Sequence, residues 1–198
     1  MSDTPLSRML SESETRRPDA LTAFRLARKR FLSSDRVEMR EIAADLGVSR
    51  TTLFRWVGSR DDLLVEICWS IAKPTLQHAT AAADDLVGGD RIASIAEAFA
   101  RSSIDAPFYR EFLRREPERA LRLNTTAASP FQERVIDHFA SVIQEEVDER
   151  RLTSTLEVAD LAYLVVRLLQ SYAYADVIAG ESPEPDKVRR SVSGFLRD

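Results

Sequence analysis

The sequence predicts an all-α fold, in which a small N-terminal unit of three helices precedes a larger helical bundle. Apolar residues recur every three or four positions along most of the chain, and no segment shows the sustained apolar/polar alternation typical of strands. Glycine and proline are few, 6 and 8 respectively. Several prolines stand where a helix is expected to begin, the position at which proline is best tolerated: Pro107, Pro117, Pro130 and Pro185.

The N-terminal unit is expected to span residues 19–58, after a flexible arm over residues 1–18 that has little apolar content. The spacing of apolar residues predicts helices over residues 19–32, 39–46 and 50–57. The second and third of these helices are short and are separated by only three residues, so the turn between them must be tight.

That turn has the composition of a helix-turn-helix. Gly47 supplies the positive φ that closes the first short helix, and Ser49 is a good N-cap for the second. Ala43 is small where the two helices must approach each other. Apolar residues follow at spacings that face inward from both helices: Ile42, Leu46, Val48, Leu53 and Trp56. An ordinary helical hairpin would not require this combination.

The rest of the chain, residues 59–198, is expected to form the larger bundle. Ser59 and Asp62 form a pattern like a capping box at the start of a long helix that reaches about Leu86, with a kink at Pro74. Gly88-Gly89-Asp90 is expected to end that section. Further helices are predicted over residues 91–105, 107–115, 117–123, 131–150, 156–179 and 185–196.

Charge is distributed unevenly between the two parts. The chain has a formal net charge of −4, but residues 16–60 hold eleven basic and five acidic residues, a net charge of +6. The remainder therefore carries −10. This asymmetry is expected when only one end of a protein contacts phosphates, although a chance cluster of solvated charges is the alternative.

If Leu53 and Trp56 face inward, the other side of the second short helix faces solvent and is available to DNA. Arginine pairs with guanine edges, threonine contacts bases or the thymine methyl group, and a helix N-terminus favours phosphate. Arg60, at the start of the next helix, is placed for a backbone phosphate. The predicted DNA-binding residues are Arg50, Thr51, Thr52, Phe54, Arg55 and Arg60.

Residues 21–64 resemble the TetR family of bacterial transcription regulators. The resemblance is carried by Ile42-Ala43, Leu46-Gly47-Val48-Ser49, Thr52-Leu53-Phe54 and the segment from Ser59 to Leu64, in the family's order and spacing. It implies a DNA-binding helix-turn-helix, a ligand-binding domain and a homodimer formed through the last two helices. It also implies base and backbone contacts for Arg50, Thr51, Thr52 and Arg55.

The chain departs from the family pattern at several positions. Phe54 replaces the usual phosphate-binding tyrosine and so lacks its hydroxyl, and Arg60 replaces the usual lysine. Val37-Glu38 stands in place of the usual Ser/Thr cap. A weaker resemblance, over residues 111–123, is to an actinobacterial branch that regulates the degradation of quorum-sensing lactones.

The bundle is rich in aromatic residues, and TetR-family members keep an apolar effector cavity in this domain. The resemblance therefore implies a small apolar effector, with a lactone as one candidate. Aromatic residues at helical spacing more often form core than pocket, so each one is a weak prediction. The predicted pocket residues are Trp69, Phe99, Phe108, Phe112, Phe131, Tyr163 and Tyr172.

In the dimer that the resemblance implies, the apolar face of residues 156–179 is expected to form the interface. It comprises Leu161, Leu164, Val165, Leu168 and Leu169, extended by Tyr172. A two-fold dimer sets its recognition helices about 34 Å or a multiple apart, which predicts a pseudo-palindromic operator in double-stranded DNA.

Little favours an enzyme. The chain has two histidines and one cysteine, without metal-ligand spacing and without a glycine-rich phosphate loop, so no cofactor or metal is expected. Cys68 lies in an apolar helix and is expected to be a small core residue. Polar residues interrupt the apolar stretch from Leu161 to Ile178, and no signal peptide is visible, so a cytoplasmic protein without a membrane span is expected. A helical adaptor that binds protein partners instead of DNA remains the alternative.

Overall fold

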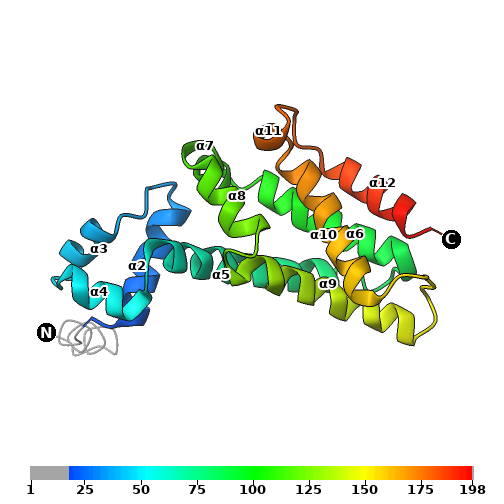
Figure 1. The fold of residues 1–198 in the computed structure, drawn as a ribbon, viewed down its shortest axis with the longest axis horizontal. Helices are drawn as coiled ribbons and strands as arrows, with labels where there is room; N and C mark the ends of the chain where they lie inside the picture. The colour runs from blue at the N-terminus through cyan, green and yellow to red at the C-terminus, as the bar shows by residue number, and fades with distance from the viewer. Residues whose placement is uncertain (1–17, 198) are drawn as a thin grey trace, which may run out of the picture.

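The computed structural model describes residues 18–197, and within them all regular structure is helical, as the sequence predicts. The molecule is elongated: α2, α3 and α4 lie at one end, and α5 runs from them into a bundle that forms the rest (Figure 1). The helices are α2 (Ala20–Leu32), α3 (Met39–Asp45), α4 (Arg50–Val57), α5 (Arg60–Ala81), α6 (Gly88–Ile104), α7 (Pro107–Arg115), α8 (Pro117–Thr125), α9 (Pro130–Asp148), α10 (Val158–Ala173), α11 (Ala175–Ile178) and α12 (Pro185–Phe195).

The predicted arm over residues 1–18 lies outside the described residues, except for Pro18. α2 begins where Asp19 accepts a hydrogen bond from the Thr22 backbone N–H at 2.7 Å, which satisfies one of the free donors of its first turn. α3 begins after Glu38, whose side chain makes no capping hydrogen bond. The missing Ser/Thr cap therefore leaves this helix start without side-chain support, as the sequence indicates.

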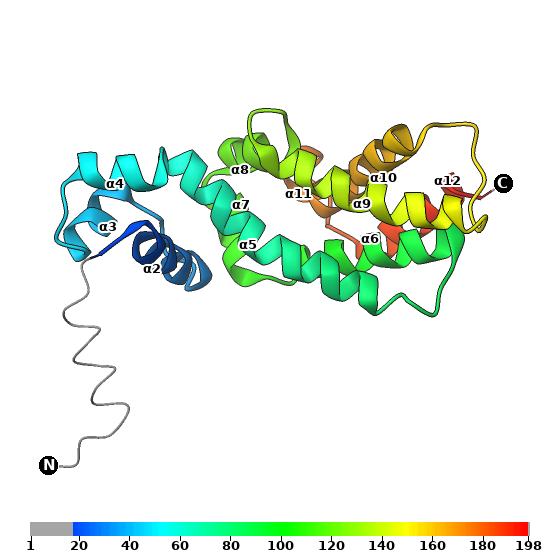
Figure 2. The same cartoon turned by 90° about the horizontal axis from the view of Figure 1, so that it is seen from below.

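The turn between α3 and α4 has the expected geometry. Gly47 has φ +64°, a left-handed conformation that glycine adopts without the strain that a Cβ brings. Ser49 is the N-cap of α4, and its Oγ accepts a hydrogen bond from the Thr52 N–H at 3.0 Å. Ile42 and Leu53 are completely buried where α3 and α4 meet α2. The predicted helix-turn-helix is therefore present (Figure 2).

α5 starts as predicted but ends earlier. Ser59 and Asp62 form a complete capping box, in which each side chain bonds the backbone N–H of the other residue. Pro74 lies inside the helix. The helix ends at Ala81 instead of about Leu86, and two acidic residues that follow, Asp84 and Asp85, would be unfavourable at the negative end of a helix dipole. The proposed domain boundary at residues 58 and 59 falls between α4 and α5.

The sequence predicts that the segment Gly88-Gly89-Asp90 lies between two helices, the second of which starts at residue 91, but α6 already begins at Gly88. The φ of Gly88 is +59°, and a Cβ there would lie 2.6 Å from the carbonyl oxygen of Arg151. Its backbone N–H donates to Glu146 Oε2 at 2.6 Å. A carboxylate of α9 thus accepts a hydrogen bond from a free backbone N–H in the first turn of α6. Because α9 is distant in sequence, the residues around Gly88 do not indicate this contact.

The predicted single helix over residues 156–179 is two helices. α10 begins at Val158 and ends at Ala173, and Tyr174 has a non-helical conformation, with φ −111° and ψ 19°, before the short α11. Tyr174 is buried, and its hydroxyl lies 2.9 Å from the Tyr109 hydroxyl. The break therefore occurs at a residue whose side chain turns into the bundle.

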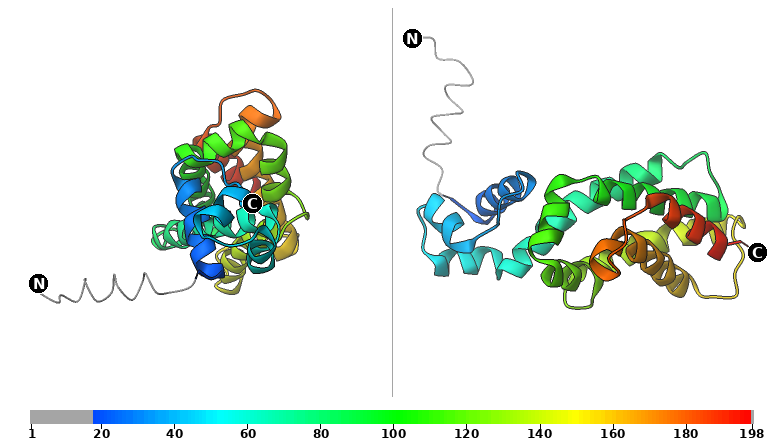
Figure 3. Two further views of the ribbon diagram at one scale, coloured as in Figure 1. Left: turned by 90° about the vertical axis from the view of Figure 1, so that its left-hand side faces the viewer. Right: turned by 90° about the horizontal axis from the view of Figure 1, so that it is seen from above.

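α6 is the central helix of the bundle. Ile92, Ile95 and Ala96 are completely buried, and α6 packs against α5, α7, α9, α10 and α12. Views along and across the long axis show α5, α6 and α9 running beside one another away from the helix-turn-helix (Figures 2 and 3). α7 packs on α6 and also contacts α2, so it lies between the bundle and the helix-turn-helix.

Candidate DNA-binding surface and ligand cavity

One face of α4 is turned to solvent. Arg50, Thr51, Phe54 and Arg55 are exposed, Phe54 by 61%, while Leu53 on the opposite face has no exposed surface. The orientation predicted from the spacing of apolar residues is therefore confirmed. Thr52 lies at the flank, half-buried, and its hydroxyl is 2.9 Å from Ser49 Oγ.

Within residues 18–197 the positive charge on this face has no acidic partner. Arg50 and Arg55 form no ion pair or hydrogen bond through their side chains in the part of the chain that the structure describes. Arg30, by contrast, lies between Glu41 and Asp45, with one nitrogen 2.5 Å from each carboxylate. Some basic residues of segment 16–60 therefore pair with acidic residues of the same chain. Arg50 and Arg55 do not, and their guanidinium groups lie on an exposed helix.

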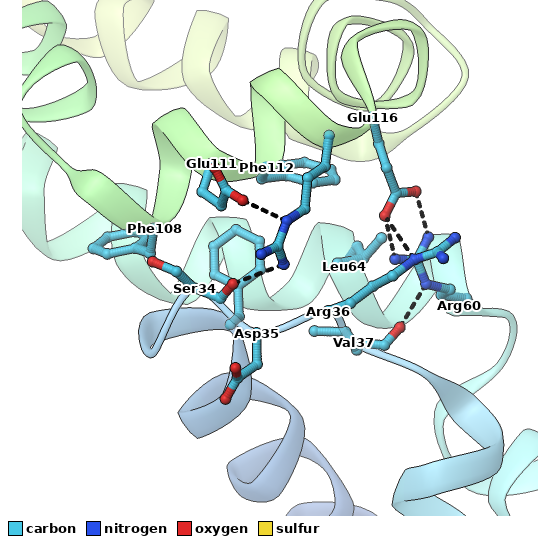
Figure 4. Close-up of a pocket in the computed structure, with 12 residues that line it drawn as sticks. Ser34, Asp35, Arg36, Val37, Arg60, Leu64, Phe108, Glu111, Phe112 and Glu116 are labelled. Atoms are coloured by element: carbon cyan, nitrogen blue, oxygen red, sulfur yellow. Dashed lines mark hydrogen bonds and ion pairs between the residues drawn. The ribbon is translucent and has the colours of Figure 1, made fainter.

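Arg60 is placed differently from the other predicted DNA-binding residues. Its Nε donates to the Val37 carbonyl oxygen at 2.6 Å, and its two terminal nitrogens lie 2.7 and 2.5 Å from the two oxygens of Glu116 (Figure 4). Only 15% of its side chain is exposed. In this conformation Arg60 joins the helix-turn-helix to the α7–α8 junction.

Glu116 lies between α7 and α8 and is both the C-cap residue of α7 and the N-cap residue of α8. Hydrogen bonding to Arg60, opposed by burial and supported by Arg119, lowers the pKa of the Glu116 carboxyl to about 2. The carboxylate is therefore ionised at neutral pH. Nearby, Arg115 donates to the Ser34 carbonyl oxygen at 2.9 Å, a second link between α7 and the turn after α2.

A cavity of about 50 Å³ lies where α2, α5, α6 and α7 meet. Phe99, Phe108 and Phe131, all predicted as pocket residues, line it. None of the lining side chains carries a formal charge at neutral pH. The complete lining is Phe31, Cys68, Ile71, Ala72, Thr75, Phe99, Ser102, Ser103, Ala106, Phe108, Tyr109, Phe131 and Tyr174.

Phe112 does not line this cavity but stands beside it. Its ring packs edge-on against Phe31, with 5.5 Å between the centroids, and the centroid of the Phe108 ring lies 5.7 Å from that of Phe31. Phe112 instead lines a smaller hollow of about 20 Å³ next to Arg60 and Glu116 (Figure 4). Phe31 and Phe108 line both spaces, so one aromatic cluster separates the cavity from the Arg60–Glu116 pair.

Three predicted pocket residues lie elsewhere. Trp69 packs against Phe131, with 6.2 Å between the ring centroids. The face of α5 that lines the cavity is formed by Cys68, Ala72 and Thr75. Trp69 lies one residue after Cys68 and so points about 100° away from that face. Tyr163 is 46% exposed on the outside of α10, under the guanidinium of Arg167. Tyr172 accepts a hydrogen bond from Ser191 at 3.0 Å and so joins α10 to α12.

Sequence reasoning gave no special weight to the paired hydroxyls of Tyr109 and Tyr174 in the cavity wall. Burial raises the pKa of Tyr174 to about 12 and that of Tyr109 well above its usual range. Both hydroxyls are therefore neutral, and each has hydrogen-bonding capacity beyond the bond that they share. Burial also raises the pKa of the Cys68 thiol to about 12, which fits a core cysteine rather than a nucleophile.

Among residues 18–197 no cluster of His, Cys, Asp and Glu side chains is arranged to hold a metal ion. No helix in the same range is both long enough and apolar enough to cross a membrane.

Comparison with known proteins identifies the family. Residues 87–197, more than half of the chain, match the family model described as "Tetracyclin repressor-like, C-terminal domain". The chain belongs to the TetR family. Its members are DNA-binding transcription factors and not enzymes, and they bind operator DNA and small-molecule effectors as dimers. None of the curated protein sequences matches the chain.

Solved structures agree with this assignment. The transcriptional repressor QsdR of R. erythropolis is 27% identical to the chain, with a TM-score of 0.81, over 90% of this chain and 96% of that one. The repressor AlkX of Dietzia sp. strain DQ12-45-1b, implicated in the biodegradation of n-alkanes, is 21% identical, with a TM-score of 0.57 over 90% of this chain and 95% of that one. The similarity to AlkX shows that the two chains share a fold and nothing more.

The interface expected from the resemblance needs a correction. Leu161, Val165 and Leu169 are 2%, 0% and 3% exposed, so they pack inside the protomer and cannot lie between two copies. Leu164 and Leu168 of the same helix remain half-buried at its outer side. The sequence pattern did not separate these two sides, because α10 is apolar over most of its circumference.

Proposed function

We propose that the protein is a ligand-responsive repressor that binds a pseudo-palindromic operator as a dimer and releases it when an apolar small molecule enters the bundle. The observation that carries the DNA-binding part is the exposed, uncompensated face of α4 with Arg50 and Arg55. Membership of the TetR family supports the same function.

On this proposal α4 enters the major groove. Arg50 and Thr51 stand in its first turn, where the helix N-terminus also favours phosphate, and Arg55 follows on the next turn. An arginine that makes a bidentate contact to guanine contributes about 1–3 kcal/mol of discrimination. Phe54 offers its ring to a thymine methyl group or to the sugar-phosphate edge, without the hydroxyl that a tyrosine would supply.

The effector site we propose is the cavity bounded by Phe99, Phe108 and Phe131. Binding sites for small molecules usually enclose about 300–1,000 Å³, far more than the 50 Å³ of this cavity. A ligand therefore binds a conformation in which the cavity is larger. A ligand shifts a conformational equilibrium only as far as it binds one state better than the other. Because only the expanded state has room for the ligand, the ligand binds that state better.

The lining also constrains the effector's chemistry. An ionised carboxylate would lose its hydration without gaining a cationic partner, so a neutral molecule is favoured. The Tyr109 and Tyr174 hydroxyls can bond one polar group of an otherwise apolar molecule. A lactone satisfies both requirements, and the resemblance of residues 111–123 to regulators of lactone degradation makes lactones the first class to test.

The dimer we propose forms through the outer sides of α10 and α12. Leu164 and Leu168 on α10, and Phe195 on α12, are half-buried apolar residues available to a second copy. Each elongated protomer has its helix-turn-helix at one end (Figure 3), so a two-fold axis at this interface must place both units against the same side of the duplex if they are to bind its two half-sites.

The test uses the full-length protein and a library of random duplexes. Selection is expected to enrich a two-fold symmetric sequence, with binding that weakens steeply as salt rises. A panel of lactones is then compared with the corresponding ring-opened hydroxy acids, and only the closed, neutral rings are expected to release the duplex. Failure to enrich any sequence would refute the operator function, and would favour a helical adaptor that binds protein partners.

A further inference from the structure

The contacts of Arg60 have a consequence for DNA binding. Only Gly58 and Ser59 separate Arg60 from α4, so its Cα stands beside the helix that enters the groove. A cation there is within reach of the phosphates that flank the groove. Yet its guanidinium is turned to Glu116 and Val37, with three of its nitrogens engaged and only 15% of the side chain exposed.

Glu116 presents to Arg60 the same chemistry as a phosphate. A carboxylate and a phosphate each offer two oxygens to the planar fork of a guanidinium, and both form strong charge-assisted hydrogen bonds. The two Arg60–Glu116 distances, 2.7 and 2.5 Å, correspond to such a bidentate pair. One guanidinium fork cannot hold a phosphate on the edge that it gives to Glu116.

We infer that Glu116 competes with a DNA phosphate for Arg60, and that this competition sets how tightly the protein binds DNA. The inference rests on the proposed function. Glu116 is a positioning residue in this account, because it acts on DNA through Arg60 and does not itself contact DNA. Glu116 is also buried to 88%, so water screens the pair poorly and the pair holds Arg60 firmly.

The surroundings indicate why the pair can be made and broken. Glu116 follows α7 directly, and α7 is a helix of nine residues, about 13 Å long. Phe108 and Tyr109 at the start of this helix line the cavity, and Glu116 comes at its other end. A shift of α7 therefore also moves the carboxylate that holds Arg60.

Two further cations near Glu116 remain to hold a released carboxylate. Arg119 is paired with Glu116 within the same turn, and Arg36 Nε lies 3.6 Å from Glu116 Oε1. Release of Arg60 to a phosphate therefore does not leave Glu116 as an isolated buried charge, which would be costly. The exchange of partners is thus feasible without unfolding the junction.

The test compares Glu116→Gln with the wild-type protein on a duplex of arbitrary sequence over a salt series. Gln keeps the shape of the side chain but loses the charge. We expect binding about 3- to 10-fold tighter at low salt, and a salt slope steeper by up to about 2 per dimer, since each protomer gains one phosphate contact. Glu118→Gln is the matched control, because Glu118 is an exposed acid two residues away and is expected to leave the slope unchanged.

Arg60 must be required for the effect. In an Arg60→Met background the further change Glu116→Gln is expected to alter neither affinity nor slope. An unchanged or shallower slope for folded Glu116→Gln, or a gain that persists without Arg60, would overturn the inference. If the wild-type protein itself shows no salt-dependent binding to any duplex, the proposed function fails as well, and the two failures are distinguishable.

A second variant covers the case in which Glu116→Gln does not fold. Arg60→Lys keeps the positive charge but cannot form the bidentate pair. It is expected to bind the same duplex at least as tightly as the wild-type protein. A loss of more than about 3-fold in a folded Arg60→Lys protein would show that the pair supports DNA binding, and would contradict competition.

Discussion

Replacing Glu146 by glutamine removes the charge from a carboxylate that has no exposed surface. Its Oε1 accepts from Arg91 at 2.7 Å and from Arg151 Nη2 at 3.0 Å, and its Oε2 accepts from Arg151 Nε at 2.7 Å and from the Gly88 N–H at 2.6 Å. This carboxylate therefore holds the start of α6, the end of α9 and the segment after α9 together. Glutamine can accept some of these bonds but brings no charge.

The size of the loss follows from the pKa. Hydrogen bonds from Arg151, opposed by burial and supported by Arg91 and Gly88, lower the pKa of Glu146 to about 2 from an ordinary 4.5. A lowered pKa stabilises the folded state above the ordinary value, and this stabilisation is lost as pH falls from 4.5 towards 2. At neutral pH the contribution is about 3 kcal/mol. Breaking a buried ion pair from one side typically costs about 3–5 kcal/mol, which agrees.

Urea unfolding of the full-length protein at one fixed concentration measures this loss, since oligomers gain apparent stability with concentration. The difference between wild type and Glu146→Gln is expected to be about 3 kcal/mol at pH 7 and to shrink to about 1 kcal/mol at pH 3. Glu149→Gln is the control, because Glu149 is 65% exposed, and its effect should stay within about 0.5 kcal/mol. A loss below about 1 kcal/mol at pH 7, or one that is equal at both pH values, would refute the reasoning.

Three other changes test the remaining parts of the structure. Ser49→Ala removes the cap of α4 and should lower the free energy of unfolding by about 1 kcal/mol, measured by urea denaturation; no change would mean that the cap is redundant. Leu53→Ala leaves a cavity at a fully buried position of α4 and should lower the free energy of unfolding by about 2–5 kcal/mol. A smaller loss, with DNA binding intact, would contradict the packing described for Leu53. Tyr174→Phe keeps the ring but leaves the Tyr109 hydroxyl without its partner, so it should cost about 1 kcal/mol and raise the concentration of lactone that releases DNA; unchanged release would remove the hydroxyl pair from the effector site.

Helix starts were predictable where the deciding residue is local. α4, α7 and α12 begin where Ser49, Pro107 and Pro185 indicate, because a cap or a first-turn proline acts within a few residues. The start of α6 was not predictable, because the group that satisfies Gly88 comes from Glu146 on another helix. The break at Tyr174 likewise depends on a partner, Tyr109, that is distant in sequence.

The same distinction applies to the candidate sites. The outward face of α4 follows from the apolar spacing around Leu53, so the exposure of Arg50 and Arg55 could be predicted. Arg60 lies at the expected point of the chain, but its partner Glu116 belongs to a different helix junction, so sequence could not show its contacts. Three of the predicted pocket residues, Phe99, Phe108 and Phe131, line the cavity. Trp69 does not, because the face of α5 that lines the cavity presents small side chains such as Ala72.

The central claim is that the exposed face of α4 reads operator DNA, and alanine variants of Arg50 and Arg55 test it most directly. Their affinities for the selected duplex and for an unrelated duplex are compared with those of the wild-type protein and of Lys73→Ala, an exposed cation on α5 outside the helix-turn-helix. Each arginine variant is predicted to lose about 1–3 kcal/mol on the selected duplex and less on the unrelated one, while Lys73→Ala binds as the wild type does. Wild-type affinity for the selected duplex in both arginine variants would contradict the account.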